Sequence, residues 1–276
     1  MTAIIAKGKS SFAEESGHWY TRDGKPAYTI IGANGKERNT TLADARKLGL
    51  VPSVSTIMQI EAKPQLIKWL VQQGMMACMT LPRNPGENDT DFMERALEDS
   101  KQQTRKAAER GSYLHGLMEQ AMRGDVIKPE DLQMYFDYIQ PVQACINDEF
   151  PGYTWAVERS AAATLGYGVA PTLGYGGKLD LTGTHPTLPP VVIDYKCKDF
   201  KPENKKKLAY VEHVTQLAAY ADMLYGPTGV RCLNIFISST VPGLFEVKEW
   251  TQAEITQGRL AFGAMLNLWQ IRKEFV

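Results

Sequence analysis

The residues best suited to chemistry are two carboxylates and a lysine that end an apolar strand pattern. The segment Gly174 to Lys198 predicts two strands joined by a proline-rich turn, with Asp180 on the first and Asp194 and Lys196 ending the second. Because side chains at i and i+2 of a strand share a face, Asp194 and Lys196 should lie side by side. Burying charges at the end of a core strand costs stability, so they indicate function. Two acidic oxygen donors beside a lysine suit a hard divalent cation and a phosphate.

A third carboxylate and a histidine could extend this group. Glu158 ends an alternating run on the preceding strand, where it would strengthen one metal site or help form a second; the competing interpretation is a solvent-facing side chain on an edge strand. Gly111, His115 and Glu119 recur every four residues and should share a helix face. Glycine in a helix costs about 1 kcal/mol relative to alanine, so Gly111 and Gly116 indicate close approach of a backbone or ligand.

A later helix carries Gln216 and Tyr220, which are four residues apart and therefore on one face. One interpretation has them contacting a phosphate or sugar near the metal. The other has the helix packed on the sheet through its leucines, with Gln216 and Tyr220 incidental.

Composition sets broad limits. The 276 residues suffice for one large or two small domains, and 43% hydrophobic with 22% charged residues is ordinary for a globular protein. Lys+Arg and Asp+Glu both number 31, so any basic surface must be local, and Lys198 to Lys207 is the candidate. The four cysteines form no CxxC pair, which argues against a zinc ribbon and favours free thiols in a reducing cytoplasm. We expect neither a signal peptide nor a membrane span, because no apolar run approaches about 20 residues.

Several nucleotide and nucleophile motifs are excluded. Lys178 follows two glycines, as in a phosphate loop, but neither Ser nor Thr follows it and a strand, not a helix, continues the chain. The Gly166-Tyr167-Gly168 run lacks the strand–helix context of a dinucleotide site. No Ser or Cys lies in a nucleophile elbow.

The chain divides into three parts by pattern. Residues 1–60 predict a small β-rich lead-in, with a hairpin at Asp23-Gly24 and a second turn at Asn34-Gly35. Residues 61–150 predict helices, the longest over about 91–122 and the last, over about 129–150, kinked at Pro141. Residues 151–276 predict the order β-β-β-α-β-β-α, with its helices over about 205–224 and 251–275. The fold class is therefore α/β, with a mixed central sheet flanked by helices.

In order and type, these residues resemble the PD-(D/E)XK nuclease superfamily in its RecB-like branch. The matching positions are Gly111 and His115 on a helix, Glu158 on a strand, Gly177 and Asp180, Asp194 and Lys196, and Gln216 and Tyr220. The earlier runs VPSVSTIM and KPQLIKW also resemble phage-encoded exonucleases and the mitochondrial genome maintenance exonuclease. The resemblance covers roughly residues 50 to 240.

The resemblance implies a restriction-endonuclease-like core and a DNA exonuclease that depends on Mg²⁺ or Mn²⁺. The implied roles are as follows: Asp180, Asp194 and the carbonyl of Tyr195 bind the metal, His115 and Glu158 complete or extend the site, Lys196 helps to activate water, and Gln216, Tyr220, Lys178 and Lys198 organise the site or contact DNA. In this branch the helices between about 60 and 150 often cover the site, which would favour a threaded single strand with aromatic side chains stacking on its bases. Trp19, Tyr20, Trp69 and Tyr113 are candidates for stacking, although most aromatic residues belong to a core.

The zero net charge departs from expectation for a protein that holds a polyanion, and it indicates a narrow basic channel or a dependence on partners. Three alternatives stay open: a double-strand-end resection nuclease paired with a phage single-strand annealing protein, a non-catalytic DNA-binding module of this fold, and an unrelated α/β protein whose charges form surface ion pairs. We expect a phage-encoded protein acting in the cytoplasm of a bacterial host.

Overall fold

A five-stranded mixed sheet organises the molecule. The computed structural model describes residues 18–62, 64–163, 174–203 and 208–275. The strands lie in chain order: β5 (Thr154–Ala163), β6 (Tyr175–Thr184), β7 (Val191–Lys198), β8 (Arg231–Ser238) and β9 (Phe245–Trp250). Neighbouring strands are antiparallel except β7 and β8, which are parallel and joined by helix α7 (Val211–Tyr225). The predicted order β-β-β-α-β-β-α is confirmed, as is a mixed α/β fold.

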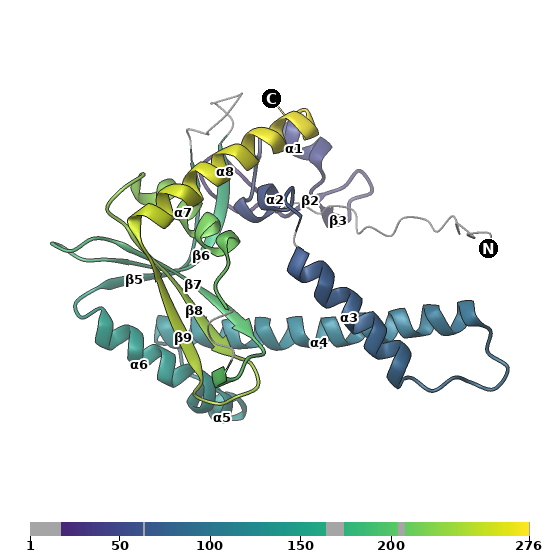
Figure 1. Ribbon diagram of the computed structural model, residues 1–276. Coiled ribbons are helices and arrows are strands. Elements are labelled where there is room, and N and C mark those ends of the chain that lie inside the picture. Colours follow the sequence, from purple (N-terminus) through teal and green to yellow (C-terminus); the bar gives the residue numbers. More distant parts are fainter. Residues whose placement is uncertain (1–17, 63, 164–173, 204–207, 276) are drawn as a thin grey trace.

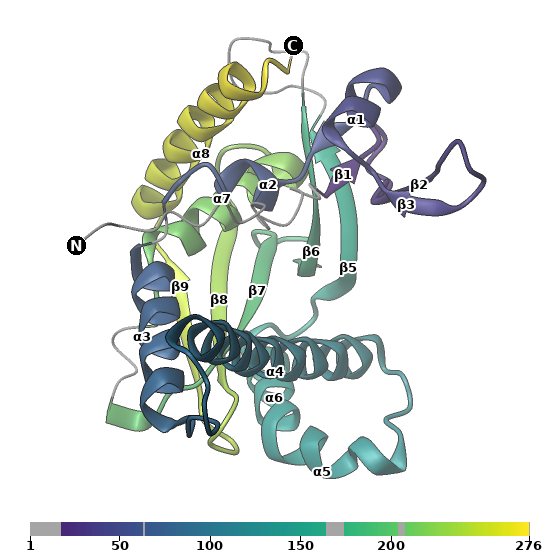
Figure 2. The same cartoon turned by 90° about the vertical axis from the view of Figure 1, so that its right-hand side faces the viewer.

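Helices cover both faces of this sheet, as Figures 1 and 2 show. One face carries α7 with α2 (Val54–Met58) and α8 (Gln252–Lys273); the other carries α4 (Asp89–Arg123) and α6 (Gln140–Glu149). Each face has its own buried apolar cluster. The cluster under α7 includes Leu179, Val192 and Leu217, and the cluster under α4 includes Leu114, Leu181 and Ile193. Val192 and Ile193 therefore face opposite ways, as the strand alternation requires.

The helical middle of the chain follows the predicted pattern in outline. Helix α3 (Pro64–Thr80) and the long α4 form a hairpin, and in Figure 1 this hairpin projects from the body. The last predicted helix is broken into four pieces: a 3₁₀ turn at Pro129–Asp131 (η1), α5 (Leu132–Met134), a π-helical turn at Tyr135–Ile139 (η2) and α6. The π turn directly precedes Pro141, where the ring leaves no N–H for a regular helical hydrogen bond.

The N-terminal part has the two predicted turns and one further strand pairing. At Asp23-Gly24 a short hairpin forms: Tyr20 and Pro26 make an antiparallel bridge, and the Thr21 N–H donates to the Lys25 carbonyl at 2.9 Å. A second hairpin joins β2 (Thr29–Ile31) and β3 (Glu37–Asn39) around Asn34-Gly35. Strand β1 (Trp19–Tyr20) also pairs with β4 (Val51–Pro52), which the sequence pattern did not predict. Both β1 side chains are only 2% exposed, so tertiary packing accounts for this pairing.

Residues 18–60 share a core with the end of the chain. The indole of Trp19 lies against Trp269 and Phe275, with ring centroids 6.1 and 5.5 Å apart. Helix α1 (Leu42–Leu48), capped by Thr41, directs Arg46 to the Glu274 carbonyl at 3.3 Å. The lead-in is thus packed onto α8.

Helix α7 begins at Val211, so the predicted start near residue 205 was wrong; the basic run at 205–207 lies outside the described residues. Among the helices that the structure describes, none has the length and apolar character needed to cross a bilayer.

Candidate active site

The centre of the site is a chain of polar contacts that starts on β7 and ends on α7. The Lys196 ammonium donates to both oxygens of Asp194, at 2.9 and 2.8 Å, and to the Gln216 carbonyl oxygen at 3.0 Å. The Gln216 amide in turn donates to the Tyr220 hydroxyl at 3.2 Å. The Asp194 side chain is 6% exposed and that of Lys196 26%. The predicted i, i+2 and i, i+4 relations therefore bring all four side chains together.

Asp180 approaches this chain from the neighbouring strand. Pairing of β6 with β7 ends at Leu181 and Ile193, and beyond it the Asp180 carboxylate accepts the main-chain N–H of Tyr195 at 2.8 Å. Burial, with the nearby Asp194 carboxylate, raises the pKa of Asp180 above its ordinary value. Two carboxylates thus meet where little water reaches them.

His115, on α4, closes the group from the other side of the sheet. Its Nδ1 lies 3.8 Å from the Asp180 carboxylate, and its ring meets the Tyr195 ring edge to face at 6.1 Å. Burial lowers the His115 pKa, against the opposing pull of Asp194. The imidazole is therefore neutral at pH 7, the form that can ligate a metal.

Glu158 marks an irregularity in the sheet that the sequence pattern did not reveal. Its φ is +53°, in the left-handed region, where a non-glycine residue is strained. On the paired strand β6 the packing changes side at the same level: Leu179 belongs to the cluster under α7, whereas Leu181, two residues on, belongs to the cluster under α4. The strand pair changes phase here, and this change accompanies the departure of Asp180 from β7.

The glycine-bearing face of α4 forms a cleft with these charges. The cleft has a volume of about 480 Å³, and its lining includes Gly111, His115, Gly116, Glu119, Glu158, Lys178, Tyr195 and Lys196. The shared helix face of Gly111, His115 and Glu119 is confirmed as geometry. A Cβ at Gly111 would lie at an ordinary contact distance, 3.8 Å, from Cys197, and one at Gly116 would meet nothing, so neither glycine is closely approached by another backbone.

The two lysines proposed to contact DNA lie in different surroundings. Lys178 lines the cleft and forms an ion pair with Glu158, leaving its side chain 45% exposed. Lys198 donates to the Leu208 carbonyl at 2.9 Å and lies over the Tyr210 ring at 4.7 Å, and burial lowers its pKa to about 8. Lys178 is thus the better placed of the two for a ligand in the cleft.

The candidate stacking residues are mostly not on an open surface. Trp19 and Tyr20 are core residues, while Tyr113 is 40% exposed and donates to Asp131 at 2.5 Å. Trp69, on α3, is partly exposed.

Asn234 is a polar core residue that the sequence analysis missed. Its side chain is fully buried on β8, beside Asp194 in the parallel register, and donates to the Asp194 carboxylate at 2.7 Å. The indole N–H of Trp250 donates to the Asn234 oxygen at 2.8 Å, which fixes the orientation of the amide. The available signal was an asparagine inside the apolar run of β8, but only the strand register places it beside Asp194.

The side chains of Asp180, Asp194 and His115 are of the kinds that bind a hard divalent cation, but they do not converge on one point in this structure. Oxygen donors from Asp180 and Asp194, with a neutral imidazole, match the preferences of Mg²⁺ and Mn²⁺. Burial and the Asp194 carboxylate raise the pKa of Asp180, and a bound divalent cation would oppose that rise. In the described part of the chain, however, no three His, Cys, Asp or Glu side chains converge on one point. Asp194 is instead held by Lys196 and Asn234.

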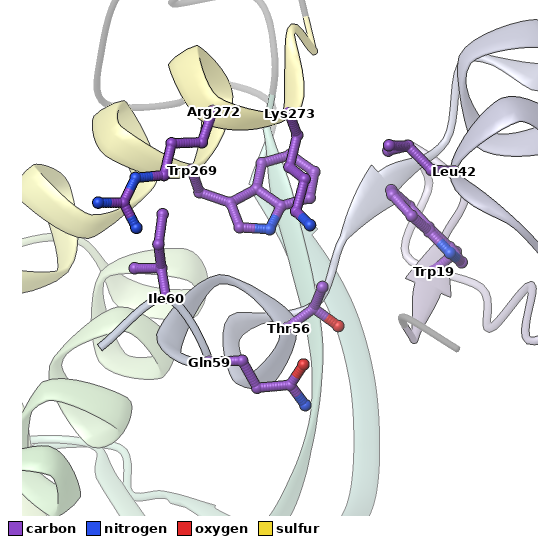
Figure 3. Close-up of a pocket in the computed structure, with 8 residues that line it drawn as sticks. All are labelled: Trp19, Leu42, Thr56, Gln59, Ile60, Trp269, Arg272 and Lys273. Atoms are coloured by element: carbon purple, nitrogen blue, oxygen red, sulfur yellow. The ribbon is translucent and has the colours of Figure 1, made fainter. Parts of the chain in front are cut away.

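A second cavity, of about 450 Å³, lies away from these charges (Figure 3). It is lined by Trp19, Leu42, Thr56, Gln59, Ile60, Trp269, Arg272 and Lys273, from the N-terminal segment and α8. Of the predicted residues, the stacking candidate Trp19 lines it, whereas the predicted metal-binding and catalytic residues do not. His115, Glu158, Lys178 and Lys196 line the cleft under α4 instead.

Comparisons with known proteins give only distant structural neighbours. No protein-family model matches the chain, and a search of curated proteins found no significant relative. The crystal structure of SSO0001 is similar with 12% identity and a TM-score of 0.33, over 74% of this chain and 87% of that chain. The crystal structure of an alkaline exonuclease from Laribacter hongkongensis is similar with 17% identity and a TM-score of 0.32, over 59% and 81% respectively. This chain is thus a weak structural neighbour of an alkaline exonuclease.

Proposed function

We propose that this protein is a DNA nuclease of the PD-(D/E)XK superfamily that requires Mg²⁺ or Mn²⁺ and degrades DNA from a free end. The observation that carries the proposal is the nearly buried Asp194–Lys196 pair beside Asp180, next to a cleft that Lys196 itself lines. An ion pair desolvated to this extent is weak support for stability, and charged groups held with perturbed pKa values in a cleft are typical of functional sites.

Each side chain has a role that follows from its contacts. Asp180, Asp194 and the Tyr195 carbonyl would hold the cation, with His115 and Glu158 available to complete its ligands. A bound divalent cation acidifies a water molecule and neutralises charge that develops on phosphate. Lys196, held by Asp194 and Gln216, would supply positive charge to the pentacovalent phosphorus. Lys178 at the cleft wall is suited to a neighbouring phosphate.

The test is cleavage of labelled linear single-stranded, linear double-stranded and circular single-stranded DNA with Mg²⁺, Mn²⁺ or EDTA. We expect metal-dependent loss of the linear forms and survival of the circle. A matched control for site lysine variants is Lys101→Ala, which removes a half-exposed lysine from the far part of α4. Cutting of the circle would identify the protein as an endonuclease instead of an exonuclease. DNA binding without cleavage would favour the non-catalytic module. Absence of both binding and cleavage would refute the family assignment.

Gly177→Ala is expected to disturb the site through Tyr220. A Cβ at Gly177 would lie 2.5 Å from Cε1 of Tyr220, so the ring must move and the Gln216 amide loses its acceptor. We expect a destabilisation of about 1–3 kcal/mol, the usual cost of overpacking, and a roughly tenfold lower cleavage rate. Gly176→Ala is the matched control, because its Cβ would meet Tyr20 at 2.7 Å instead. Equal cleavage by the two variants at equal thermal stability would contradict the role of Tyr220.

Asn234→Ala is expected to free the Asp194 carboxylate. The substitution removes one of the donors to the Asp194 carboxylate, which keeps its contact with Lys196, and leaves the Trp250 N–H without its acceptor, at a cost of about 1–3 kcal/mol. Asn234→Asp should be worse, because it sets a second carboxylate against Asp194. We expect the Mn²⁺ titration, followed calorimetrically, to show weaker binding for both variants. Trp250→Phe is a milder control, because it removes the indole N–H that orients Asn234 but leaves the contact of Asn234 with Asp194 in place. Unchanged Mn²⁺ affinity in Asn234→Asp would show that Asn234 does not position Asp194.

A further inference from the structure

Helix α3 exposes most of its large apolar side chains. Ala77 and Ala96 are 4% and 1% exposed, so α3 and α4 meet through small residues. Outside that contact, Ile67, Val71, Met75 and Met79 follow each other at intervals of four and form one row along α3. Their exposed fractions are 55%, 56%, 60% and 78%. This reverses the arrangement expected of a surface helix.

The row continues onto α4 as one apolar face. Met93 and Leu97, 56% and 53% exposed, line an apolar groove of about 430 Å³ together with Gly74, Met75, Cys78 and Met79. We call this set, with Ile67 and Val71, the arm face. Six large side chains that are half exposed or more offer on the order of 600 Å², at the upper end of the largest patch on a typical monomer.

We propose that the arm face is a homodimer interface, in which the hairpins of two copies pack into a four-helix bundle. Two such faces would bury on the order of 1,200 Å², the lower bound of a specific, stable interface. The arm face contains no charged residue, and helix α3 carries only Lys68 in its 17 residues, so nothing on it selects a charged partner. An identical uncharged face is self-complementary under a two-fold axis.

The shape of the molecule allows this contact. Figure 1 shows the hairpin standing away from the sheet, so that a second hairpin can lie along it. In an antiparallel pair, the row Ile67, Val71, Met75 and Met79 of one copy runs against Met79, Met75, Val71 and Ile67 of the other. The two-fold axis then passes close to Gly74, where an added Cβ would meet no atom within 4 Å. Four-helix bundles bury apolar rows of this kind in their centre.

The first test is the molar mass in solution, by light scattering, at about 1–100 μM, the range in which interfaces of this size dissociate. The full chain should have the dimer mass. The double variant Val71→Glu, Met75→Glu should dissociate at least about a hundredfold more readily, whereas Leu260→Glu, an equally exposed position on α8, should not. A monomeric wild type at every concentration, or a double variant of unchanged mass, would refute the proposal.

A second measurement tests the geometry without relying on loss of binding. In a Cys78→Ser background, Gly74→Cys should form an intermolecular disulfide on mild oxidation, while Val126→Cys, 91% exposed and away from the arm, should not. Equal cross-linking of the two variants would contradict an axis at Gly74. Because neither measurement involves cleavage, the dimer can fail while the nuclease stands, and the reverse.

Discussion

Lys196→Ala nearly eliminates cleavage, and this is the largest effect that we expect. Loss of one preorganised charge or donor at a transition state lowers kcat by about 10²–10³-fold, and Lys196 is the cation that contacts Asp194 and Gln216 together. The measurement is single-turnover cleavage of end-labelled linear DNA at saturating Mg²⁺. DNA affinity, measured in Ca²⁺ or EDTA, should change much less than the rate.

Lys196→Arg serves as the conservative comparison. Arginine keeps the positive charge but changes the reach and shape of the donor, so partial activity is expected only if charge alone suffices. Lys101→Ala should retain the wild-type rate. A Lys196→Ala variant that cleaves within about tenfold of wild type would remove this lysine from the mechanism.

Asp180→Asn is expected to remove the stabilisation of the protein by Mn²⁺. In the absence of metal, the same substitution should raise the stability of the folded state at neutral pH. The pKa of Asp180 is raised in the folded protein by burial and by Asp194, so the folded state holds a proton that the unfolded state has released. Stability without metal should therefore fall as the pH rises from the unfolded pKa near 4 through the folded value. Asparagine still offers an oxygen to the Tyr195 N–H and does not ionise, so the variant should lack this slope.

Thermal unfolding from pH 4 to pH 9, with EDTA or with Mn²⁺, measures both effects. In EDTA the variant should exceed wild type at high pH by several degrees, since 1 kcal/mol is worth roughly 2–4 °C in a domain of this size. Mn²⁺ should raise the Tm of wild type, increasingly with pH, and leave the variant unchanged. A wild-type Tm that is independent of Mn²⁺ at pH 8 would argue against a cation at Asp180.

The sheet and the polar chain on β7 and α7 were predictable because they depend on short-range patterns. Alternation fixes the shared face of Asp194 and Lys196, and helical periodicity fixes that of Gln216 and Tyr220. The order of strands followed from turn residues and from the apolar runs between them.

The features that were missed depend on register and tertiary packing. Asn234 reaches Asp194 because β8 pairs with β7 in one particular parallel register, which no local pattern encodes. The left-handed backbone of Glu158 occurs in a run that reads as regular alternation. Strand β1 forms the short predicted hairpin with Pro26, but no local pattern encodes its second pairing, with β4. The helix α3 has an apolar pattern, and only the structure shows that its large side chains face outward.

The contact of Trp19 with Trp269 and Phe275 imposes an order on biosynthesis. The five strands pair with sequence neighbours and can assemble locally, whereas the segment from β1 to α2 is covered first by β6 and α7 and completed only by α8, some two hundred residues later. At 5–20 residues per second, that delay is about 10–40 s. Throughout it, the apolar side chains of Trp19, Val54 and Ile57 lack part of their final cover. The nascent segment from β1 to α2 therefore presents apolar side chains that a chaperone can bind until α8 is made.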